Sequence, residues 1–66
     1  MGILFDLRQK IEAEIKAKNL DKYEVRGRIM LKTGFTIAFI TTDTPDDPYK
    51  ITQLKEAMRE VLGIQI

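Results

Sequence analysis

The chain contains no cysteine, no histidine and no tryptophan among its 66 residues. Without cysteine it has no disulfide, no thiolate zinc site and no thiol nucleophile. Without histidine it has no imidazole for acid–base catalysis or for a Ser-His-Asp arrangement, and common transition-metal sites lose a main ligand. We therefore expect a protein that is not an enzyme and that holds no metal and no cofactor.

Long apolar runs are missing as well. No stretch approaches the roughly 18 apolar residues of a membrane-spanning helix. The first residues, Met-Gly-Ile-Leu-Phe-Asp, have neither the basic start nor the small-residue cleavage site of a signal peptide. The lack of cysteine is compatible with a reducing compartment. These features favour a cytoplasmic protein with no membrane partner.

Glycine and proline are scarce, with four and two residues. The glycines stand alone, so neither of the common glycine-rich phosphate-binding loops is present. Asp43, Asp46 and Asp47 share one short stretch, but they lack the ligand spacing and the closing glutamate of a calcium loop. Turn formation and helix capping account for all three aspartates.

The composition is that of a folded chain, with 44% hydrophobic residues, 32% charged residues and a net charge of +1. A chain of this length forms one domain, residues 1–66. Small domains are usually reinforced by disulfides, a metal or self-association. Because the first two look excluded here, self-association is the remaining device.

Two segments have the spacing of amphipathic helices. In residues 3–18 the apolar positions are Leu4, Leu7, Ile11 and Ile15, and Glu12–Lys16 and Glu14–Lys18 are favourably ordered pairs. Asp6 and Gln9 read as a capping box that leaves residues 2–5 free to form a short strand, and Asn19 suits a left-handed end.

The second amphipathic helix follows a loop rich in aspartate and proline. Asp47 is suited to cap its start, with Pro48 in the first turn, and Gly63 is suited to end it. Its apolar stripe consists of Ile51, Leu54, Met58, Val61 and Leu62. Residues 63–66 could form a further short strand.

Between the helices, residues 23–42 are rich in β-branched and aromatic side chains, which predicts a β-hairpin. With Gly34 in the left-handed position of a bulge, Leu31 pairs with Phe35 and Gly27 with Phe39. The predicted fold class is α+β, a two-layer α-β-β-α arrangement with an antiparallel hairpin packed on two amphipathic helices. If residues 2–5 and 63–66 are strands, the order becomes the βαββαβ of ferredoxin-like folds.

The hairpin face turned away from the helices is the candidate interaction site. It carries Arg26, Arg28, Met30, Ala38 and Ile40, although a solvated face should be uniformly polar. We expect a non-catalytic interaction module that forms a homodimer through this face, since a two-stranded sheet is marginal alone and its edges invite pairing.

Other interpretations stay open. Scattered apolar residues on a surface are normal. A nucleic-acid-binding domain could use Arg26, Arg28 and Lys32 to contact phosphates, although the face lacks stacking aromatics and the net charge is near neutral. The Lys/Glu content without His, Cys or Trp also suits a thermophile protein, or a designed one that has no natural function.

Overall fold

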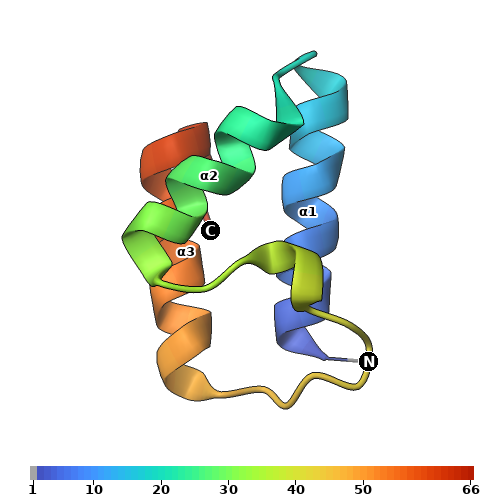
Figure 1. Ribbon diagram of the computed structural model, residues 1–66, viewed down its shortest axis with the longest axis vertical. Helices are drawn as coiled ribbons and strands as arrows, with labels where there is room; N and C mark the ends of the chain where they lie inside the picture. The colour runs from blue at the N-terminus through green and yellow to red at the C-terminus, as the bar shows by residue number, and fades with distance from the viewer. Residues whose placement is uncertain (1) are drawn as a thin grey trace.

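A computed structural model describes residues 2–66 and contains three α-helices and one short 3-10 turn (Figure 1). The elements are α1 (Ile3–Ala17), α2 (Lys22–Thr33), the 3-10 turn η1 (Ile37–Phe39) and α3 (Pro48–Leu62). No strand occurs in residues 2–66, so this part of the chain is all-α. The predicted α+β class is wrong, and so is the ferredoxin-like alternative.

The two predicted amphipathic helices are confirmed as α1 and α3. Asp47 caps α3 by accepting a hydrogen bond from the backbone N–H of Tyr49, Pro48 follows in the first turn, and Gly63 ends the helix in the left-handed region. Asn19 adopts the predicted left-handed conformation after α1. The predicted capping box is wrong, because α1 already begins at Ile3; residues 3–5 are helical, and residues 63–66 form no strand.

The predicted hairpin is replaced by α2 and η1. Asp21 caps α2, because its carboxylate accepts hydrogen bonds from the backbone N–H groups of Tyr23 and Glu24. Gly34 ends α2 with φ 81° and donates its N–H to the carbonyl of Met30. The left-handed Gly34 was therefore predicted correctly, but it terminates a helix instead of forming a strand bulge.

One apolar core joins all of these elements. Val25 and Ile29 face it from α2, four residues apart, and Ile37 and Ile40 enter it from η1 and the residue after it. The 3-10 turn repeats every three residues, so it brings Ile37 and Ile40 to the same side. The remaining buried residues lie on α1 and α3: Leu4, Leu7, Ile11, Ile15, Leu54, Ala57, Met58 and Leu62.

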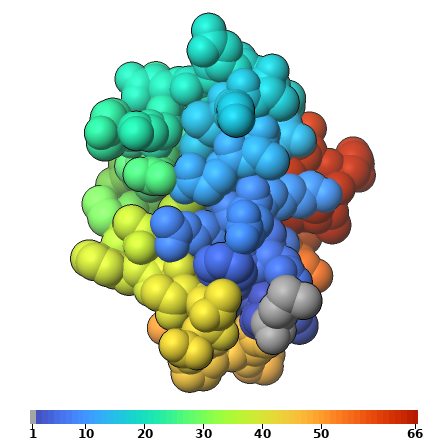
Figure 2. All heavy atoms as spheres, turned by 90° about the vertical axis from the view of Figure 1, so that its right-hand side faces the viewer, coloured from blue at the N-terminus to red at the C-terminus, as the bar shows by residue number. Residues whose placement is uncertain are grey.

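The helices enclose this core from three directions (Figure 1). The helix α2 crosses between the upper parts of α1 and α3 and packs mainly on α3, and η1 lies between the end of α2 and the lower half of α1. Figure 2 shows α2 and the yellow segment that follows it along one side of α1. None of the helices described is long and apolar enough to span a membrane.

Candidate functional site

The residues predicted to share a hairpin face do not form one surface in the structure. Ile40 is buried in the core, with only 4% of its surface exposed, whereas Ala38 is exposed and Met30 is half exposed. They come from two different elements, because Met30 lies on α2 while Ala38 and Ile40 belong to η1 and its end. The predicted dimer interface on a hairpin is therefore wrong.

The three basic residues predicted to contact nucleic acid each lie beside a carboxylate. Arg26 contacts Glu12 at 2.6 Å, Arg28 contacts Glu24 at 2.7 Å, and Lys32 contacts Glu60 at 2.7 Å. These carboxylates reduce the net positive charge that binding along the phosphate backbone of a nucleic acid needs. The basic strand on which the nucleic-acid interpretation depended does not exist, and the structure adds no support for that partner.

Of the two ion pairs predicted within α1, one forms and the other does not. Glu14 and Lys18 form the predicted pair within α1, with 3.1 Å between Oε2 and Nζ. Glu12 pairs across the helices with Arg26 instead of with Lys16. The sequence offered no local signal for this contact, since the two residues are 14 positions apart.

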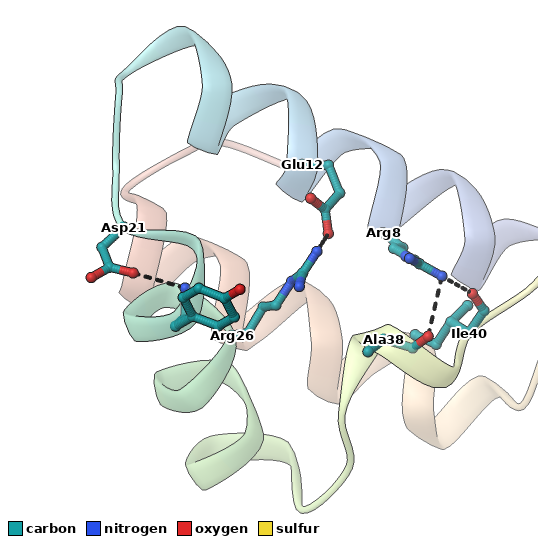
Figure 3. Close-up of polar contacts among 7 residues, drawn as sticks. Arg8, Glu12, Asp21, Arg26, Ala38 and Ile40 are labelled. Carbon is teal, nitrogen blue, oxygen red and sulfur yellow. Dashed lines mark hydrogen bonds and ion pairs between the residues drawn. The ribbon is translucent and has the colours of Figure 1, made fainter.

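Arg8 joins α1 to the segment that contains η1. Its Nη1 donates hydrogen bonds to the carbonyl oxygens of Ile40 at 2.6 Å and of Ala38 at 3.4 Å (Figure 3). Residues at the end of η1 lack helical partners for their carbonyls, and the guanidinium supplies them. No local pattern in the sequence indicates this role of Arg8, because its partners lie 30 and 32 positions away.

A surface hollow of about 340 Å³ lies beside these contacts. It is lined by Phe5, Arg8, Gln9, Glu12 and Arg26, four residues from α1 and one from α2. Figure 3 shows Glu12 and Arg26 meeting between α1 and α2, and Arg8 reaching from α1 towards Ala38 and Ile40. We call this hollow the arginine pocket.

A second candidate surface is the side of α2 turned away from the core. Tyr23, Gly27, Met30 and Leu31 stand at positions i, i+4, i+7 and i+8, which places them in one stripe along the helix. Tyr23 is 72% exposed, Met30 47% and Leu31 84%. We call these four residues the α2 outer face; the helical spacing in the sequence was its available signal.

Phe39 is a further exposed apolar residue, on the neighbouring η1 turn. Its side chain is 82% exposed, and η1 packs against α2. Phe39 also borders a smaller hollow of about 140 Å³ with Phe35 and Lys50. Large apolar side chains thus accumulate on the α2 and η1 side of the molecule.

Two of the three aspartates before α3, Asp46 and Asp47, accept hydrogen bonds from backbone N–H groups at helix starts. Asp47 caps α3, and Asp46 accepts a 3.1 Å hydrogen bond from the backbone N–H of Leu4 in α1. Hydrogen bonds from the backbone N–H groups of Ile3 and Leu4 lower the pKa of the Asp46 carboxyl below its ordinary value. Within residues 2–66 no three potential metal ligands come together.

Comparisons with protein-family models, with characterised proteins and with solved structures gave no match. The functional conclusions therefore depend on the chain's own residues. Two surface features are the candidates for a functional role: the α2 outer face and the arginine pocket.

Proposed function

We propose that this chain is a non-catalytic module that binds a second copy of itself through the α2 outer face. The observation that carries the proposal is the exposure of Tyr23, Met30 and Leu31 in a single stripe on a helix whose opposite side already packs on the core. A helix that is apolar on two sides is typical of one that is covered on two sides. In the described residues of one chain, the side of α2 with Val25 and Ile29 is covered by the core, whereas Tyr23 and Leu31 stay exposed.

The arrangement of the face is compatible with two-fold symmetry. Gly27 lies four residues from both Tyr23 and Leu31, so each is about 6 Å from it along the helix and about 40° to either side. If two α2 helices cross antiparallel at Gly27, Tyr23 of each copy lies level with Leu31 of the other. Each apolar contact then occurs twice, as in any two-fold dimer.

The charges beside the face are also self-complementary. Glu24 and Arg28 lie next to each other on the same flank of the stripe, and their carboxylate and guanidinium are 58% and 61% exposed. In the antiparallel arrangement, Glu24 of one copy is offset by only about 3 Å along the axis from Arg28 of the other. A flank with one charge of each sign favours a second copy over a strongly acidic or basic partner.

Gly27 allows the two backbones to come close. It has no side chain at the centre of the stripe, and a Cβ atom added there would meet nothing within 4 Å in the single chain. A glycine in a helix interior costs about 0.5–1 kcal/mol relative to alanine. Close approach of a second helix is a reason for a glycine at this position.

The test is the mass in solution of the chain and of two matched variants, measured by sedimentation over a range of concentrations. We expect the mass to rise towards twice the 7.6 kDa of one chain. Tyr23→Ser removes two ring contacts per dimer, which should cost at least about 2 kcal/mol and raise the Kd about 30-fold.

Tyr49→Ser is the control. Tyr49 is 70% exposed, and like Tyr23 it stands two residues after an aspartate cap and donates its backbone N–H to that cap at 2.9 Å. This variant should associate as the original chain does. A chain that stays monomeric at millimolar concentration would overturn the proposal, and so would equal weakening by the two substitutions.

A further inference from the structure

The arginine pocket carries more positive than negative charge. Arg8 and Arg26 contribute two guanidinium groups, and Glu12 contributes the one carboxylate among the lining residues. Gln9 adds a neutral amide that can donate hydrogen bonds. The volume of about 340 Å³ lies within the range of small-molecule sites.

Much of the hydrogen-bonding capacity of the two arginines is uncommitted. Arg8 makes both of its backbone hydrogen bonds through Nη1, and Arg26 contacts Glu12 through Nη2. A guanidinium has five N–H donors in a planar fork. Structural roles within the described residues therefore occupy one nitrogen of each arginine.

One polar group of Arg26 lacks a hydrogen-bond partner among the described residues. Its Nε is buried and donates to no acceptor within residues 2–66. A buried donor without a partner is unfavourable and needs an explanation. A negative charge in the adjacent pocket stabilises the whole guanidinium, including the part that Glu12 does not reach.

We infer that the arginine pocket binds the phosphate group of a small phosphomonoester. Arg8, Arg26 and Gln9 each bring N–H donors to the lining, the three terminal oxygens of a phosphate accept such donors, and arginine favours planar, paired contacts with phosphate. Phe5 forms an apolar part of the wall, so the group esterified to the phosphate is apolar or aromatic in part. This site is separate from the α2 outer face and does not depend on self-association.

The test is a titration with phenyl phosphate at low salt, followed by the backbone amide signals in NMR spectra. We expect saturable shifts confined to the residues around Phe5, Arg8, Glu12 and Arg26, with a Kd on the order of 1 mM for an open surface site. Inorganic phosphate should shift the same signals more weakly, because it lacks the ring that contacts Phe5. Benzoate should also bind more weakly, because it offers two carboxylate oxygens in place of three terminal phosphate oxygens and carries less negative charge.

Two substitutions with the same change in charge separate the pocket from general attraction. Gln9→Glu places a carboxylate at the pocket, on an exposed position, and should weaken phenyl phosphate about fivefold or more. Gln65→Glu makes the same change at an exposed position after α3 and should leave the affinity unchanged. Equal effects of the two variants, shifts spread over all basic residues, or no saturation would overturn the site, and equal binding of benzoate would overturn its assignment to phosphate.

Discussion

Asp46 ties the start of α1 to the loop that precedes α3. Gly2, which precedes α1, offers no side chain to cap the helix, and the first N–H groups of a helix have no partner within it. The Asp46 carboxylate accepts a hydrogen bond from the N–H of Leu4, 42 positions away in sequence. A negative charge at this helix end also interacts favourably with the helix dipole.

Replacing Asp46 should lower stability in a way that depends on pH. The pKa of its carboxyl is lower in the folded chain than in the unfolded one, so the folded state binds fewer protons. The stabilisation is therefore present above the unfolded pKa near 4 and is lost as the pH falls through the lower folded pKa. We expect Asp46→Asn to lower the melting temperature at pH 7 and to make little difference near pH 2.

Asp43→Asn is the matched control for this experiment, because Asp43 is exposed in the same loop and its carboxylate makes no hydrogen bond to the described residues. Its melting temperature should follow that of the original chain at both pH values. If the two substitutions have the same effect, the contribution of Asp46 is general charge and not the cap on α1.

At the scale of single residues, the sequence predicted a role correctly where the interacting groups are neighbours along the chain. The cap from Asp47 and the left-handed Gly63 depend on neighbouring residues, and both were predicted. The roles of Arg8 and Asp46 depend on groups at least 30 positions away, which no local pattern reveals. Ile40 was assigned to a surface because its environment was derived from strand register, and the register disappeared with the strands.

At the scale of elements, α2 is where the sequence was misinterpreted. Alternate positions Tyr23, Val25, Ile29 and Leu31 are apolar, which is a strand pattern. When the same residues are placed on a helix, Val25 and Ile29 face the core, whereas Tyr23 and Leu31 face outwards. A helix that is apolar on two sides produces both patterns, so the α2 outer face is also the reason for the error.

The signals that favoured a helix stood at its ends and along its flank. Asp21 followed three positions later by Glu24 is a capping pattern, Glu24 and Arg28 form an i,i+4 pair, and Gly34 is a typical helix end. Gly27 is a signal against a helix in this segment, because glycine is unfavourable in a helix interior. For α2, the capping residues are therefore a better indicator of the helix than the apolar period, although the hairpin prediction did not use them.

Gly27→Ala should stabilise the folded chain. Gly27 is helical and has free space around an added Cβ, so alanine should add about 0.5–1 kcal/mol to the free energy of unfolding. The measurement is denaturant unfolding at several low protein concentrations, extrapolated to the limit at which self-association makes no contribution. Gly34→Ala is the comparison: space is free there too, but φ is 81°, so alanine should destabilise. A loss of stability in both variants would contradict the assignment of Gly27 to a helix interior.

At the scale of the whole molecule, residues 2–66 form a three-helix domain whose core uses one side of each helix. Its 66 residues can bury only a limited core, and no disulfide can reinforce it. Covering the α2 outer face would remove Tyr23 and Leu31 from water and add stability that depends on concentration. Self-association, which the composition favoured, thus remains the proposal, on a helix face in place of the hairpin.

The most direct measurement uses the absence of cysteine from the chain. Gly27→Cys places one thiol at the proposed crossing point, where an antiparallel dimer would bring the two Cα atoms within the roughly 7 Å that a disulfide allows. Thr52→Cys places one at an exposed position on α3 as a control. In a glutathione redox buffer, we expect Gly27→Cys to form a linked dimer at thiol ratios that leave Thr52→Cys monomeric. Equal linkage of the two variants at every ratio would contradict an antiparallel dimer through the α2 outer face.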